Sequence, residues 1–71
     1  MSHSIPSGET IRRLRKAAGL TQKELAKKAG LSQSLISRIE RSDVDPRLST
    51  IRRIMYVIEG STVKEGQVAS H

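Results

Sequence analysis

The sequence predicts a small all-α domain, and three observations support that prediction. Apolar residues recur at helical spacings in four segments, residues that start or end helices flank these segments, and no stretch alternates polar and apolar residues long enough to build a sheet. The chain has 71 residues, enough for one domain whose core usually contributes a net stability of about 3 to 5 kcal/mol. The four segments are therefore expected to pack as a single bundle.

The first expected helix lies between Ser7 and Gly19. Its apolar stripe, formed by Ile11, Leu14 and Ala18, has the i, i+3, i+7 spacing of one helical face. Ser7 can cap the free amide groups at the start, and Gly19 can adopt the left-handed conformation that ends a helix.

The second expected helix begins after Thr21 and ends at Gly30. Thr21 and Glu24 have the spacing of a capping box. Leu20 and Leu25 lie where a hydrophobic staple forms, so this is the most strongly marked helix start in the chain.

The third expected helix begins after Ser32, only two residues beyond Gly30. Two helices joined by so short a turn need a small residue where they touch and a glycine where the chain reverses. Ala26 and Gly30 fill these two roles, and Ile36 is expected to seat the third helix on the second. This arrangement is a helix-turn-helix.

The fourth expected helix ends at Gly60 and closes the core. Asp45-Pro46 and Ser49 precede it as start signals. Its apolar stripe consists of Ile51, Ile54, Met55 and Ile58.

The chain thus divides into three parts. Residues 1–6 lack periodicity and are expected to form a flexible N-terminal arm, and residues 7–60 form the helix-turn-helix domain. Residues 61–71 mix Gly, Ser and β-branched residues and are expected to be a flexible tail or a linker. Such a linker would suit a C-terminal ligand-sensing domain that is absent from this chain.

The composition indicates an anionic partner. Lys and Arg number 13 against seven Asp and Glu, a formal net charge of +6. Nucleic acid is the leading partner, a membrane surface is second, and a basic surface that only maintains solubility is the alternative. Tyr56 is the only aromatic residue, which argues against a platform for stacking single-stranded bases.

Several function classes are disfavoured. The chain has no cysteine, and His3 and His71 both lie in the expected tails, so no catalytic base or metal cluster is evident and neither an enzyme nor a cofactor is expected. No apolar run is long enough to span a membrane, and residues 1–7 lack the features of a signal peptide. The absence of cysteine fits a reducing compartment, and the cytoplasm is the expected location.

The exposed face of the third helix suggests what the chain binds. At 100° per residue, this face carries Gln and Ser from the first turn and Arg further on, and it carries no acid. Such side chains can pair with base edges or with phosphates in the major groove of DNA. The alternative is that this face is an ordinary solvated surface. Three observations weigh against that alternative: the tight turn before the helix, its start with Gln and Ser, and the basic charge of the chain. The face consists of Gln33, Ser34, Ser37, Arg38 and Arg41.

Three motifs in the stretch Leu14–Arg41 resemble a known family. The stretch contains L-T-Q-K-E-L-A, then A-G-L-S, then I-S-R-I-E, all in register. It resembles the Cro/CI-type (XRE-like, lambda-repressor-like) helix-turn-helix family of phage and prokaryotic repressors, from about Ile11 to Ile58. The resemblance implies a bundle of four to five helices that binds double-stranded DNA and regulates transcription, by default as a repressor in a prokaryotic cytoplasm.

The resemblance also implies roles for individual residues. The residues that meet bases would be Gln33, Ser34, Ser37 and Arg38. The resemblance places Gln22 against a phosphate of the DNA backbone, and the further predicted backbone contacts are Lys23, Ser32 and Arg41. Arg15 and Glu40 resemble the family's partly buried ion pair, which joins the first helix to the third.

Two departures from the family pattern are visible. Ser42 stands where the family usually has glycine after the recognition helix, so a different loop is expected over 42–47. No fifth helix, the family's frequent dimer surface, is evident after Gly60.

A homodimer on a palindromic operator is nevertheless expected, because one such module buries too little surface for tight binding. The half-sites would lie about 34 Å apart. The rival function is a protein-interaction module, such as an antitoxin or an adaptor. Replacement of Gln33 and Ser34 separates the two, because a partner bound through the fourth helix would not be affected.

Overall fold

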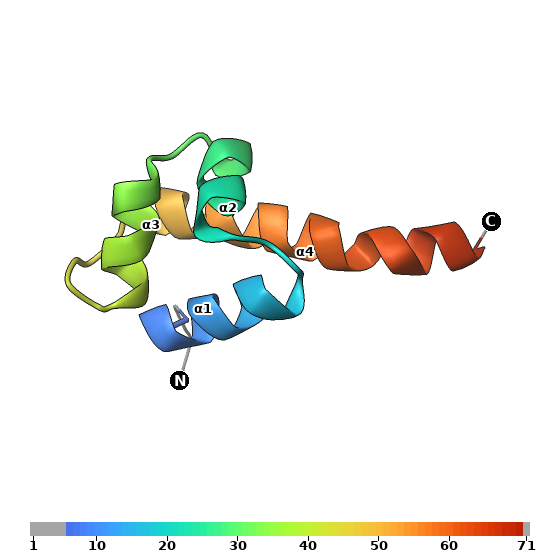
Figure 1. Ribbon diagram of the computed structural model, residues 1–71, viewed down its shortest axis with the longest axis horizontal. Helices are drawn as coiled ribbons and strands as arrows, with labels where there is room; N and C mark the ends of the chain where they lie inside the picture. The colour runs from blue at the N-terminus through green and yellow to red at the C-terminus, as the bar shows by residue number, and fades with distance from the viewer. Residues whose placement is uncertain (1–5, 71) are drawn as a thin grey trace.

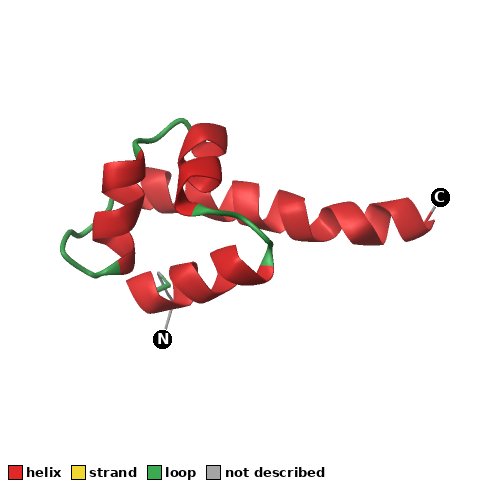
Figure 2. Cartoon of the chain, viewed as in Figure 1, coloured by secondary structure: helices red, strands yellow, loops and turns green. Residues whose placement is uncertain are grey.

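The structure is a computed structural model that describes the backbone of residues 6–70 and the side chains of residues 6–61. Within that range the chain forms four helices and no strand (Figures 1 and 2). α2 packs against α3 and α4, and α1 packs against α3 and α4. The all-α helical bundle is thus confirmed, with four helices: α1 (Gly8–Ala17), α2 (Gln22–Ala29), α3 (Gln33–Glu40) and α4 (Leu48–Ser70). Residues 1–5 of the expected arm lie outside the described residues.

The core is entirely aliphatic, and all four helices contribute to it. Full burial of each large side chain contributes roughly 1.5 to 3 kcal/mol. The residues expected in the helical stripes are buried, except that Leu14, Ala18 and Met55 lie at the margin, half-buried. The buried hydrophobic residues are Ile11, Leu20, Leu25, Ala26, Ala29, Ile36, Ile39, Ile51, Ile54 and Ile58.

Side-chain caps begin the first three helices as the sequence predicts. The side-chain oxygens of Ser7, Thr21 and Ser32 each accept a hydrogen bond from the backbone N–H three residues later. The capping box of α2 is complete, because the Glu24 carboxylate accepts the backbone N–H of Thr21 at 2.9 Å. This hydrogen bond holds the pKa of the Glu24 carboxyl below its usual value.

A left-handed residue follows each of the first three helices. Gly19 and Gly30 have φ values of 77° and 72°, and Ser42 has a φ of 63°. The backbone N–H of Asp43 donates to the carbonyl of Arg38 at 2.9 Å, the long hydrogen bond of a Schellman turn. Ser42 therefore takes the conformation that glycine would take, at the steric cost that its Cβ imposes.

Replacing Ser42 by glycine is expected to raise the free energy of unfolding by about 0.5 to 1 kcal/mol, because the left-handed strain disappears. Urea denaturation measures the change. Ser49→Gly is the matched control, since Ser49 is exposed in the first turn of α4 and glycine there lowers helix propensity. A Ser42→Gly variant less stable than wild type would contradict this explanation of the turn.

The sequence-based end of the fourth helix at Gly60 was wrong. α4 begins at Leu48, so Ser49 lies inside it, and the helix continues to Ser70. Gly60 is not among the residues with positive φ, and an interior glycine costs only about 1 kcal/mol relative to alanine, which does not stop a helix. The C-terminal part of α4 extends away from the other helices (Figure 1). The role of residues 61–71 as a linker stays a prediction.

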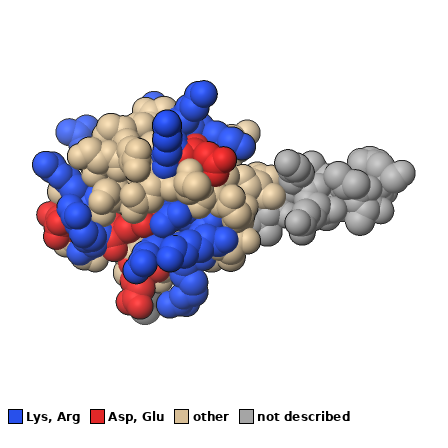
Figure 3. Space-filling model, viewed as in Figure 1, with Lys and Arg blue, Asp and Glu red and all other residues tan. Residues whose placement is uncertain are grey.

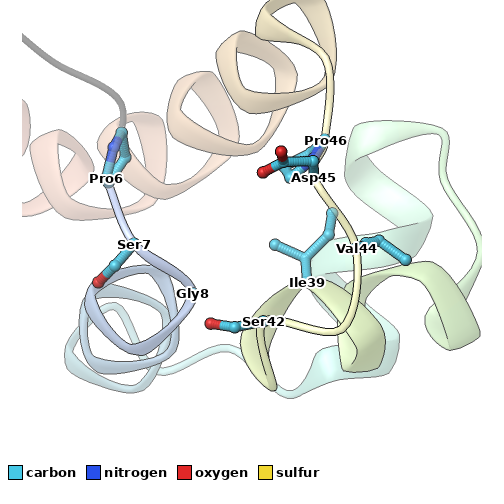
Figure 4. A pocket seen from close by; sticks show the side chains of 8 residues that line it. All are labelled: Pro6, Ser7, Gly8, Ile39, Ser42, Val44, Asp45 and Pro46. Carbon is cyan, nitrogen blue, oxygen red and sulfur yellow. The ribbon is translucent and has the colours of Figure 1, made fainter.

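α1 and α3 approach each other closely at Gly8. A Cβ added to Gly8 would overlap the backbone carbonyl oxygen of Ile39 and lie 3.0 Å from that of Glu40. Beside this contact lies a pocket of about 290 Å³ (Figure 4). Its lining includes no Lys or Arg and has one acid, so it does not suit an anion. The lining residues are Pro6, Ser7, Gly8, Ile39, Ser42, Val44, Asp45 and Pro46.

Candidate nucleic-acid interface

The turn between α2 and α3 has the geometry that a helix-turn-helix requires. Gly30 is the left-handed C-cap of α2, and Ser32 is already the N-cap of α3. Ala26 is 3% exposed in α2, and Ile36 of α3 is completely buried. The small side chain lets the two helices approach, and Ile36 anchors α3 in the core.

α3 presents one polar face to solvent. Its buried side carries Ile36 and Ile39, and the residues expected to meet DNA lie mostly on the other side. Ser37 is the exception, because it is half-buried. The exposed members are Gln33, Ser34, Arg38 and Arg41.

The first two residues of α3, Gln33 and Ser34, lie at its N-terminal end, where unpaired backbone N–H groups carry partial positive charge. Phosphate groups are attracted to such an end. The Ser32 side chain already accepts the backbone N–H of Leu35 at 3.0 Å, so its hydroxyl proton is the group left to donate to a phosphate.

A buried ion pair fixes α3 to α1. The Arg15 Nε donates to Glu40 Oε2 at 2.6 Å, and a second guanidinium nitrogen donates to Glu40 Oε1 at 3.1 Å. The remaining nitrogen donates to the carbonyl oxygen of Leu20 at 2.8 Å. The side chains of Arg15 and Glu40 are only 8% and 2% exposed, so the ion pair is buried beside the aliphatic core.

Gln22 joins the same network. It is half-buried at the first position of α2, and its side-chain amide donates to Glu40 Oε1 at 3.1 Å. This bond was not anticipated, because the resemblance assigns Gln22 to a phosphate. One amide hydrogen and the side-chain carbonyl remain for other partners. Glu40 thus ties α1, α2 and α3 together.

A basic pocket of about 370 Å³ opens above this network, between α1, α2 and α3. Exposed Arg12 and Lys16 line it from α1, and exposed Arg41 lines it from the end of α3. The Arg41 side chain pairs with Asp43 at 3.1 Å, but both groups are more than half exposed, so an anion can compete for Arg41 at little cost. The pocket is suited to a phosphate group. The full lining is Arg12, Arg15, Lys16, Gln22, Ser37, Glu40 and Arg41.

The positive charge extends beyond the pocket. Figure 3 shows Lys and Arg side chains over several parts of the face in view, with smaller acidic areas among them. Lys23, the remaining expected backbone contact, is exposed in the first turn of α2. Arg12 and Lys16 were not among the predicted DNA contacts. Their i, i+4 spacing places both on the outer face of α1 and could have indicated a shared basic surface.

Comparison with known proteins identifies the family. A family model described as helix-turn-helix matches residues 11–57, which is most of the chain. The chain belongs to the Cro/CI-type helix-turn-helix family. This family consists of DNA-binding transcription regulators and is not an enzyme family. A comparison with curated proteins finds no match to the sequence.

Two other features, a metal site and a membrane-spanning helix, were sought among the described residues, and neither is found there. Its side chains include no group of three or more His, Cys, Asp or Glu residues that could hold a metal ion. None of the helices traced in residues 6–70 is long and apolar enough to cross a membrane.

Proposed function

We propose that this protein is a sequence-specific regulator of transcription that inserts α3 into the major groove of double-stranded DNA. The observation that carries the proposal is the exposed, acid-free polar surface at the start of α3, on a helix whose other side is locked into the core. Rigid support of this kind suits a reading helix, because base pairing tolerates little displacement of the donor and acceptor groups.

In this proposal Gln33, Ser34 and Arg38 contact base edges. A glutamine can pair with adenine through two hydrogen bonds, and an arginine can pair with guanine in the same way. Ser37 is half-buried and lines the basic pocket, so its hydroxyl would contact the edge of the major groove of the DNA.

Phosphates on either side of the groove hold the protein in register. The basic pocket would receive one phosphate, between Arg12, Lys16 and Arg41. Lys23, Ser32 and the free part of the Gln22 amide would contact neighbouring phosphates around the starts of α2 and α3. Contacts of this kind position a protein without reading its sequence.

Repression in a prokaryotic cytoplasm is the proposed outcome, through a homodimer on a palindromic operator. A module of this size buries too little surface for tight operator binding, and two copies would supply the remainder. A protein that occupies an operator in this way would block transcription by exclusion.

Gln33→Ala is expected to weaken binding to the preferred duplex by roughly 5- to 150-fold, equivalent to about 1 to 3 kcal/mol, and to relax specificity at one base pair. Fluorescence anisotropy with the preferred duplex and with duplexes substituted at each position measures both effects. Lys23→Ala is the contrasting variant. It should weaken all duplexes about equally and lower the salt slope by about one. An equal loss on every duplex for Gln33→Ala would assign Gln33 to a phosphate.

A further inference from the structure

The outer side of α4 carries the two exposed large hydrophobic residues of the described chain. Tyr56 is 80% exposed and Leu48 is 51% exposed. Neither contributes to the core or to the polar surface of α3. Exposed tyrosine is enriched at protein interfaces, where its ring supplies contact area and its hydroxyl stays hydrated.

Charges of opposite sign flank Tyr56 on the same side of the helix. Arg52 lies one turn before it and Glu59 lies nearly one turn after it, and both are exposed. We call this surface the α4 face. At 100° per residue its members fall within an arc of about 100°. They are Leu48, Arg52, Met55, Tyr56 and Glu59.

The α4 face is self-complementary in one orientation only. Arg52 and Glu59 are equally distant along the helix from the point midway between Met55 and Tyr56. A twofold axis at that point sets each Arg52 opposite the second copy's Glu59 and each Tyr56 over the second copy's Met55. A parallel arrangement would instead bring like charges together, which is repulsive.

We propose that the α4 face is the interface between two copies of this chain, packed antiparallel about this axis. The contacts that carry it are two Arg52–Glu59 ion pairs and two aromatic–methionine contacts, which thioether sulfur favours. α4 has 23 residues, a length of roughly 35 Å, so the helix extends on both sides of the axis. A twofold pair is the commonest symmetry among oligomers and matches a palindrome.

This inference deepens the proposed function, because it identifies an interface for the homodimer that a palindromic operator needs. Only the role of the dimer in DNA binding rests on the proposed function. Dimerisation can be measured without DNA. Failure of the interface and failure of DNA reading are therefore separate results.

Sedimentation equilibrium of the full chain without DNA tests the proposal. Arg52→Glu and Glu59→Arg should each weaken the dimer at least about tenfold, because two attractive pairs become repulsive. The double variant Arg52→Glu, Glu59→Arg should restore the dissociation constant to within about threefold of wild type, since the exchanged charges pair again.

Arg53→Glu is the matched control, because it makes the same charge change on the same helix outside the α4 face. The Arg53 guanidinium lies near Gly30, at the end of α2. The dimer constant should stay unchanged for this variant, and circular dichroism should show that every variant keeps its helices. A wild-type chain that stays monomeric up to about 1 mM, or a double variant no tighter than the single ones, would overturn the proposal.

Discussion

Replacing Arg15 by methionine is expected to lower the free energy of unfolding by about 3 to 5 kcal/mol, which is comparable to the whole net stability of so small a domain and leaves a large fraction of it unfolded at 25 °C. The variant would bury the Glu40 carboxylate without its guanidinium and would remove the donor to the carbonyl of Leu20. Far-ultraviolet circular dichroism and urea denaturation measure the loss.

Two further variants show whether burial of the pair is the cause. Arg41→Met breaks the exposed pair with Asp43 and should cost less than about 1 kcal/mol. The double variant Arg15→Met, Glu40→Leu removes both buried charges and should be at least about 1 kcal/mol more stable than Arg15→Met alone. An Arg15→Met variant as stable as Arg41→Met would contradict the structural role assigned to the buried pair.

Gly8→Ala is expected to lower the free energy of unfolding by about 2 to 3 kcal/mol, within the range of overpacked sites. The added Cβ would meet the backbone carbonyl of Ile39, and a backbone group cannot turn aside as a flexible side chain can. α1 must therefore move away from α3. Thermal denaturation should show a melting temperature lower by about 8 to 24 °C for a domain of this size.

The matched control is the same substitution at another helical glycine. A Cβ at Gly60 has no atom within 4 Å, so Gly60→Ala should raise stability by up to about 1 kcal/mol through helix propensity alone. Opposite signs for the two variants are the expected result. If both variants were stabilised, the close approach of α1 to α3 would be absent in solution.

Local signals explain why much of the fold could be predicted. The caps at Ser7, Thr21 and Ser32 and the turns at Gly19 and Gly30 involve residues within a few positions of one another, and the structure shows each of them. The helical stripes likewise placed the core, because burial follows the period of the helix.

The features that were missed depend on contacts between distant segments or on competition between local preferences. Gly8 meets α3 more than thirty residues away, and no sequence pattern near Gly8 reports such a contact. Glycine favours helix ends, so the sequence predicted an end at Gly60, but α4 continues through Gly60 to Ser70. Ser42 adopts the left-handed turn although serine disfavours it, because the chain must reverse there.

The candidate site divides in the same way. The helical spacing of α3 identified the exposed positions Gln33, Ser34 and Arg38. It could not identify the bond between Gln22 and Glu40, or the basic pocket above it, because both form only when α1, α2 and α3 pack together.

The most direct test of the central claim is selection of random duplex DNA on the purified protein, with the winning sequence and a scrambled duplex then compared across a salt series. The claim that α3 reads the major groove predicts an enriched palindrome bound at least about 10³-fold more tightly than scrambled DNA. A steep salt dependence with no enriched sequence would contradict it, because the charge of the protein would then bind phosphates without any reading of bases.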